Sequence, residues 1–181
     1  DDQVEVFELF WYFCPHCHDF EPHLRYWRAS SPDHVSFRQV PAVFRKSWLP
    51  HAHAYYAAEI MGVLDRFHLP LFDALHNKKR RIFTREALAD FVAEQGIDRA
   101  EFLRTYDSFA VQARVKQAIL YTQRSEITGV PSMVINGKYR TSGSMAGGFA
   151  NVIQVVRVLV AEEARTMGLE AAGDAVSADG G

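Results

Sequence analysis

The sequence predicts an α/β protein in which a block of helices is inserted between the strands of one sheet. Three observations support this prediction. An almost continuous apolar run rich in aromatic and β-branched residues occupies 4–13, strand patterns return at 132–141, and helix signals without a convincing strand fill the segment between about 47 and 125. The strands from the two ends of the chain are therefore expected to meet in a single sheet.

The length and composition are those of a globular protein. The chain has 181 residues, of which 48% are apolar and 23% are charged, enough to bury a substantial core in one domain with an insertion. The 20 basic and 22 acidic residues nearly balance, so we expect no binding to nucleic acid. No run approaches the ~20 apolar residues of a membrane span. The chain starts with Asp1-Asp2 instead of a basic and apolar leader, so we expect that any targeting peptide has been removed.

The first part of the chain predicts a strand, a helix and a second strand. Residues 4–13 are nearly all apolar, as expected for a strand that is buried on both faces. Pro15 suits the first position of the following helix, because its missing N–H needs no partner there. Apolar residues then recur at helical spacing, at Cys17, Phe20, Leu24 and Trp27. The helix is expected to end near Ser30, and 35–40 alternates as a strand that Pro41 ends.

The middle of the chain carries several helix boundaries. Gly62 is expected to end one helix, and Thr84 to begin another that Gly96 ends. Asp98 followed by Glu101 resembles a capping box at the start of the next helix. These signals predict an all-helical segment made of several helices.

The last part of the chain returns to strands and closes with a helix. Residues 132–136 predict a strand, and Asn136-Gly137 predicts a hairpin turn into a second strand at 138–141. A helix is expected at roughly 149–167, with an apolar face. Beyond Leu169 the chain is rich in Ala, Gly, Asp and Ser, which is typical of a disordered tail.

The chain contains two cysteines, Cys14 and Cys17, and they lie three positions apart. A disulfide between them would close a very small loop and would remove little conformational entropy from the unfolded chain. The pair therefore cannot staple distant segments together. We expect it to carry chemistry instead.

Two alternatives to redox chemistry use the same residues. Cys14, Cys17 and His18 match the C-x-x-C-H signature of covalent haem attachment, but a motif that ends a buried strand and begins a helix with a proline does not suit a haem pocket. The same three residues with His23 could bind zinc, but structural zinc sites usually use two separated pairs of ligands and the sequence has no second pair. We therefore expect no metal and no cofactor.

A redox dithiol explains the motif better. Cys14 is expected at the N-cap of the helix, where free backbone N–H groups and the helix dipole favour its thiolate. Cys17 would lie one turn inside the helix, shielded from solvent, in the position of a resolving thiol. His16, between them, would further favour the thiolate when it is protonated. A stabilised thiolate stabilises the reduced state and makes the disulfide a stronger oxidant.

Two residues elsewhere in the sequence are candidates for the same site. Glu8 shares the strand face of Val4 and Val6, so its carboxyl is expected to be buried. It is either a core acid paired with a lysine or an arginine, or the proton acceptor beneath Cys17, and we favour the second interpretation because perturbed groups cluster at active sites. Pro131 lies at the boundary of a predicted strand, where it could simply end the strand or belong to a loop next to the redox motif.

The remaining histidines of the helical segment show no metal-like spacing. We expect these four histidines to lie at the surface: His51, His53, His68 and His76.

The residues above resemble the DsbA family, the periplasmic thiol:disulfide oxidoreductases of Gram-negative bacteria. Cys14-Pro15-His16-Cys17 has the Pro-His dipeptide of the oxidising members, and Glu8 stands six residues before the first cysteine, where the family keeps a buried carboxylate. Thr128-Gly129-Val130-Pro131 is similar to the cis-proline segment, and Asn136-Gly137-Lys138-Tyr139 to the hairpin that follows it. His18 is a departure, since the family often has an aromatic residue there.

The resemblance implies a thioredoxin fold with an inserted helical domain. Residues 1–46 and 126–170 would form a discontinuous thioredoxin-like domain, residues 47–125 the helical insertion, and residues 171–181 the disordered tail. Pro15 and His16 would act with the two cysteines and Glu8 in catalysis. Val130 and Pro131 would bind the substrate peptide.

The resemblance also implies the activity. A periplasmic monomer would pass the Cys14–Cys17 disulfide to unfolded exported proteins that carry free cysteines, and a DsbB-like membrane quinone reductase would reoxidise it. The alternatives are a disulfide isomerase or reductase, and a thiol-binding chaperone or metal carrier on the same fold. A measured redox potential would distinguish them.

Overall fold

The computed structural model describes residues 2–169, and the predicted tail at 171–181 lies outside them. Its sheet contains β1 (Val4–Phe10), β2 (Val35–Pro41), β3 (Ser132–Ile135) and β4 (Tyr139–Ser142), in the order β2-β1-β3-β4. β1 is parallel to β2 and antiparallel to β3, which is antiparallel to β4. The prediction that strands from both ends of the chain share one sheet is confirmed.

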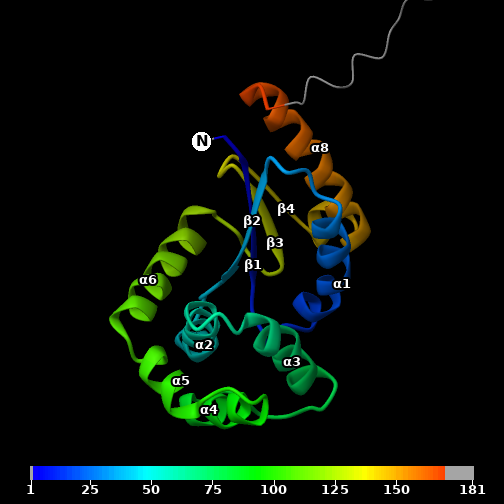
Figure 1. Ribbon diagram of the computed structural model, residues 1–181. Coiled ribbons are helices and arrows are strands. Elements are labelled where there is room, and N and C mark those ends of the chain that lie inside the picture. The colour runs from blue at the N-terminus through cyan, green and yellow to red at the C-terminus, as the bar shows by residue number, and fades with distance from the viewer. Residues whose placement is uncertain (1, 170–181) are drawn as a thin grey trace, which may run out of the picture.

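Helices surround this sheet on both faces and at one end. They are α1 (Pro15–Ala29), the 3₁₀ turn η1 (Lys46–Trp48), α2 (Leu49–Ile60), α3 (Leu64–His76), α4 (Arg85–Glu94), α5 (Arg99–Tyr106), α6 (Phe109–Arg124), α7 (Gly143–Ala146) and α8 (Phe149–Met167). α1 and α8 cover one face, α6 lies across the other, and α2 to α5 gather beyond the end of β1 (Figure 1). Within residues 2–169, no helix is apolar over a stretch long enough to cross a bilayer.

Local signals in the sequence account for most helix boundaries. Asp98 caps α5, where its carboxylate accepts a hydrogen bond of 2.7 Å from the backbone N–H of Glu101. Thr84 caps α4 in the same way, with its hydroxyl oxygen 3.1 Å from the N–H of Ala87. Gly96 follows α4 with φ of +73°, a left-handed conformation that glycine adopts without a steric penalty. These predicted boundaries are confirmed.

The β3–β4 hairpin also follows from its sequence. Asn136 and Gly137 have left-handed φ of 49° and 65°, and Lys138 completes the three-residue connection between the paired residues Ile135 and Tyr139. The Asn136 side chain accepts a 2.8 Å hydrogen bond from the backbone N–H of Glu5 and so ties the turn to β1. The hairpin therefore extends the sheet next to β1.

Two cores share the sheet. One lies between the sheet and the α1–α8 face and consists of Val4, Val6, Phe20, Leu24, Trp27, Met133, Ile135, Val152, Ile153, Val156, Val160 and Ala164. The other joins the end of β1 to the inserted helices, so that Phe10 and Tyr12 pack against Phe67 and Phe72. The helical insertion and the active-site end of the sheet therefore share one continuous core, while the domain boundaries stated above stay a prediction.

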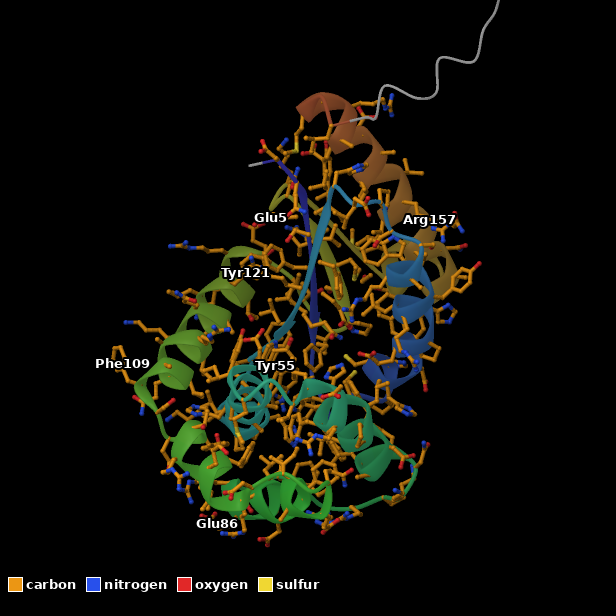
Figure 2. All side chains as sticks on the ribbon, in the orientation of Figure 1. Glu5, Tyr55, Glu86, Phe109, Tyr121 and Arg157 are labelled. Carbon is orange, nitrogen blue, oxygen red and sulfur yellow. The ribbon has the colours of Figure 1, made fainter. Side chains whose placement is uncertain are left out.

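α6 packs one side against the sheet and exposes the other side to solvent. Tyr121 of α6 faces the sheet, with its ring centroid 4.6 Å from that of Phe7, whereas Phe109 at the start of the helix points outward and is 84% exposed (Figure 2). α6 thus packs on the sheet through its inner face only.

Candidate active site

Cys14 lies at the N-cap of α1, separated from the end of β1 by the turn at residues 11–13. Its backbone is extended, with φ of −80° and ψ of 117°, and Pro15 follows as the first residue of the helix. The backbone N–H of Cys14 donates to the carbonyl of Trp11 at 3.1 Å and its own carbonyl accepts from His18 at 3.2 Å. The predicted N-cap position is confirmed. The sulfur is therefore presented to the free N–H groups of the first helical turn.

This position favours the thiolate of Cys14. The pKa of the thiol falls from 9.0 to about 6, first because the thiol of Cys17 donates a hydrogen bond to the Cys14 sulfur. Partial burial opposes the fall, and the backbone N–H groups of Cys17 and His16 and the charge of His16 add to it. His16 itself is exposed at the surface. Cys14 is thus predominantly thiolate at neutral pH.

Cys17 has the opposite environment. It is fully buried, one turn into α1, and its sulfur accepts a 3.5 Å hydrogen bond from the backbone N–H of Trp11. Burial raises the pKa of this thiol well above its ordinary value, and the hydrogen bond to Cys14 and the charge of Glu8 raise it further. The two cysteines are not joined by a disulfide in this structure. A partly buried sulfur that favours the thiolate and a buried thiol therefore lie in the same helical turn.

Val130 and Pro131 lie next to Cys14 although they are more than a hundred positions away in sequence. The thiol of Cys14 points at the carbonyl oxygen of Val130, at 3.6 Å, and the Val130–Pro131 peptide bond is cis as predicted. Both residues line a groove of about 580 Å³ that His16 and Phe149 also border. The groove runs along the cis-proline loop, in which the Val130 carbonyl contacts the Cys14 sulfur.

Glu8 is buried beneath this helix turn. Its side chain is 0% exposed and one carboxylate oxygen accepts a 2.8 Å hydrogen bond from Gln39, the residue opposite it on β2. No lysine or arginine within residues 2–169 hydrogen-bonds to it, so the ion-paired alternative does not apply. Burial raises the pKa of Glu8, and the charge of Glu21 raises it further. Glu8 is therefore a carboxyl group that takes up a proton readily.

Sequence reasoning missed four residues that surround Glu8. Gln39 donates through Nε2 to Glu21 at 2.9 Å as well as to Glu8. Glu21 also contacts His68 Nε2 at 2.9 Å, and the other ring nitrogen of His68 lies 2.7 Å from the Tyr12 hydroxyl. Glu21 follows Cys17 by four positions, on the same helix face, and this spacing could have identified it. No local signal identifies the other three.

The expectation that the histidines of the helical segment lie at the surface is wrong for His51 and His68. They are only 1% and 8% exposed, because each ring finds hydrogen-bond partners in the interior. His51 Nε2 lies 2.8 Å from the carbonyl oxygen of Ile82, and burial lowers the pKa of His51 to about 4. His53 and His76 are partly buried and contact backbone carbonyls in the same way. Within residues 2–169, no cluster of histidine, cysteine or acidic side chains is arranged to hold a metal ion.

The arrangement suits thiol–disulfide exchange. The attacking species in this reaction is a thiolate, and exchange needs a second thiol within reach to break the mixed disulfide. Cys14 meets the first requirement through its position at the helix N-terminus. Cys17 meets the second through its place in the following turn, above a buried carboxyl group.

Comparisons with known proteins agree with this chemistry. The profile of the DSBA-like thioredoxin domain matches residues 39–150. The thiol:disulfide interchange protein DsbA of Azotobacter vinelandii is 43% identical over 161 residues, which cover 89% of this chain and 75% of that protein. DsbA of Pseudomonas syringae pv. tomato is 40% identical, with the same coverage.

Solved structures of DsbA proteins share the fold. The crystal structure of Pseudomonas aeruginosa DsbA superposes with a TM-score of 0.88 at 38% identity, over 92% of this chain and 87% of that one. The oxidoreductase DsbA from Xylella fastidiosa superposes with a TM-score of 0.84 at 34% identity, over 91% and 88% of the two chains. The thioredoxin fold with a helical insertion is thus confirmed. With a reactive dithiol at the start of α1 and these relatives, the chain belongs to the DsbA family and is a thiol:disulfide oxidoreductase.

Proposed function

We propose that this protein oxidises the thiols of unfolded exported proteins, with Cys14 as the exchanging sulfur and Cys17 as the resolving sulfur. The observation that carries the proposal is the pKa of Cys14, which falls to about 6 while that of its partner Cys17 rises. A stabilised thiolate makes the reduced state favourable, and the disulfide then gives up its oxidising equivalents readily, a behaviour for which DsbA is itself the standard example.

The reaction follows from this asymmetry. A substrate thiolate attacks the Cys14 sulfur of the disulfide, the Cys14–Cys17 bond breaks, and Cys17 leaves and takes up a proton. A second substrate thiolate then attacks the substrate sulfur of the mixed disulfide, and Cys14 leaves as a thiolate. The substrate gains a disulfide and loses two electrons, which the two cysteines of the enzyme receive.

The groove along the cis-proline loop supports the proposed peptide substrate. The substrate peptide would lie in the groove at Val130 and Pro131, where it can bond to exposed backbone next to Cys14. A DsbB-like quinone reductase in the membrane would reoxidise the enzyme at the same sulfur. The protein would act in the periplasm as a monomer.

The test separates the two sulfurs. Reduced protein is alkylated at pH 6.5 and the labelled cysteine is located by mass spectrometry; we expect the label on Cys14, because ordinary thiols stay protonated there. Cys17→Ala should accumulate long-lived mixed disulfides with a reduced, unfolded substrate protein after oxidation with a small disulfide. Cys14→Ala should form none.

Two results would contradict the proposal. Labelling of Cys17 in preference to Cys14 would reverse the roles of the two sulfurs. An equilibrium with glutathione that leaves the Cys14–Cys17 disulfide intact would make the protein a reductase instead of an oxidant.

A further inference from the structure

His68 joins the helical insertion to the carboxyl groups under the dithiol. It lies on α3 and contacts Glu21 of α1, which in turn shares the amide of Gln39 with Glu8 of β1. The three titratable members of the cluster are buried, since Glu8, Glu21 and His68 are 0%, 6% and 8% exposed, and Gln39 is partly buried. His68 is the one basic side chain that hydrogen-bonds to this cluster among the residues that the structure describes.

If His68 were neutral, the cluster would hold two carboxyl groups and no positively charged hydrogen-bond partner. Glu8 and Glu21 both accept from Nε2 of Gln39, at 2.8 and 2.9 Å, so their carboxyl groups face one neutral donor. Two buried carboxylates so close together repel, and one of them then takes up a proton. The charge of Glu21 acts in this way, since it raises the pKa of Glu8.

The surroundings of His68 suit an imidazolium ion. Its ring nitrogens lie 2.9 Å from a Glu21 oxygen and 2.7 Å from the Tyr12 hydroxyl oxygen, so both N–H groups of the charged ring have an acceptor. The Gln39 amide nitrogen lies 3.2 Å from His68 Nε2 and donates a hydrogen bond to the same Glu21 oxygen.

Other titratable groups near the cluster do not supply this charge. Tyr55 of α2 stands edge-on to the His68 ring, and burial raises its pKa above its ordinary value, so it stays neutral. Arg28 of α1 lowers the pKa of Glu8 by its charge alone, without a hydrogen bond to it. Among the residues that the structure describes, His68 is thus the basic side chain placed against Glu21.

We propose that His68 is a positioning residue for the redox reaction: its imidazolium neutralises Glu21 and thereby favours the ionised form of Glu8, which takes the proton of Cys17. When the enzyme is reoxidised, Cys17 passes its proton to the Glu8 carboxylate and its sulfur attacks Cys14 in the mixed disulfide. The bond between Cys14 and the partner sulfur breaks, and the partner leaves as a thiolate with the electron pair. This inference rests on the proposed roles of the two cysteines.

The step can be isolated with oxidised glutathione. In the first stage, Cys14 attacks oxidised glutathione, releases one glutathione and forms a mixed disulfide with the other. In the second stage, Cys17 attacks the mixed disulfide and releases the remaining glutathione. Acid quenching and mass spectrometry follow both stages from pH 5 to 9. In His68→Gln and His68→Phe, the first stage should keep its wild-type rate. The midpoint of the second stage should move up by about one pH unit, which slows this stage by up to about tenfold at pH values below the wild-type midpoint.

The two variants separate charge from packing. His68→Gln keeps a donor for Glu21 and His68→Phe keeps a ring, while both remove the charge, so both should show the shift. A wild-type profile in His68→Gln would mean that the hydrogen bond alone matters and would overturn the proposal. His51→Gln and His51→Phe are matched controls, since His51 is equally buried but bonds to the carbonyl of Ile82, and they should keep the wild-type midpoint.

Two further measurements complete the test. His68→Gln should cause no additional shift in a Glu8→Gln background, because both changes act on one proton acceptor. Nitrogen NMR of the wild-type protein at neutral pH should show both ring nitrogens of His68 protonated, and a neutral ring would refute the proposal even if a variant fails to fold. If the wild-type protein forms no mixed disulfide at Cys14, the roles of the cysteines fail, and the NMR signal still decides the charge of His68.

Discussion

Two residues of the same type have opposite acidities because α1 places them differently. Cys14 stands before the first turn, where backbone N–H groups and the thiol of Cys17 stabilise its negative charge. Cys17 is enclosed by apolar side chains, and burial penalises its charged form more than any other effect. In the proposed reaction, exchange therefore begins at Cys14, and a proton leaves Cys17 before this sulfur attacks.

The first prediction concerns Glu8, the proposed acceptor of that proton. Replacing Glu8 with Gln keeps a group of the same size on β1 but removes the base, so we expect the attack by Cys17 on a mixed disulfide to slow about tenfold or more. The attack by Cys14 on oxidised glutathione should keep its rate. Rapid-quench kinetics measure both steps.

Glu5→Gln is the matched control, because Glu5 is exposed at the opposite end of the same strand (Figure 2). Its kinetics should equal those of the wild type. If Glu8→Gln also left both steps unchanged, Glu8 would be a packing residue.

At the scale of an element, short polar side chains at the starts of helices contribute measurably to the free energy of unfolding. The α5 cap is a single contact of 2.7 Å from the backbone of Glu101 to Asp98, far from the dithiol in the fold. Asp98→Ala should lower the free energy of unfolding by about 1 kcal/mol, because one N–H group of the first turn loses its partner. Urea unfolding followed by circular dichroism measures this change, and the exchange rate with glutathione should stay constant.

Asp98→Asn tests whether the hydrogen bond or the charge matters in this cap. An asparagine oxygen can accept the same bond, so the variant should keep nearly the wild-type stability. A loss as large as in Asp98→Ala would assign the effect to the helix dipole instead.

At the scale of the whole molecule, the shared core predicts cooperative unfolding. Phe72 of α3 is 1% exposed and packs on Phe10 and Tyr12 at the end of the first strand segment. Phe72→Ala should cost about 3–5 kcal/mol and shift one single unfolding transition, because sheet and insertion lose their contact together. Phe109→Ala, at an exposed position, should change stability by less than about 0.5 kcal/mol. Two separate transitions in Phe72→Ala would show that the insertion folds independently.

The redox state should also change the stability of the whole molecule. The reduced form gains the Cys14 thiolate, whose pKa is about 6 in the folded protein against an ordinary 9.0. This gain is complete above the ordinary value and disappears as the pH falls through about 6. The disulfide offsets it little, since it closes a very small loop. Thermal melts at pH 7.5 should therefore show the reduced form as the more stable, with the difference vanishing near pH 5. A more stable oxidised form at pH 7.5 would argue against an oxidant.

Local features of the chain were predictable because neighbouring residues decide them. The strand before the dithiol, Pro15 at the first turn, the Asp98 cap and the Asn136-Gly137 turn all depend on contacts within a few positions. The acidity difference between the cysteines also follows from their places in one helical turn. The sequence by itself therefore determined the order of the elements and the reactive pair.

The surroundings of Glu8 were decided only by the tertiary structure. Gln39 reaches it because the parallel register of β1 and β2 sets them opposite each other, and His68 reaches Glu21 because α3 packs against α1 across 47 positions of sequence. Strand register and helix packing depend on how the whole core closes, which no local pattern records. The same packing buries His68, although its polarity and its spacing in the sequence predicted a surface position. A side chain whose partners come from other elements acquires its protonation state, and hence its role, only in the folded molecule.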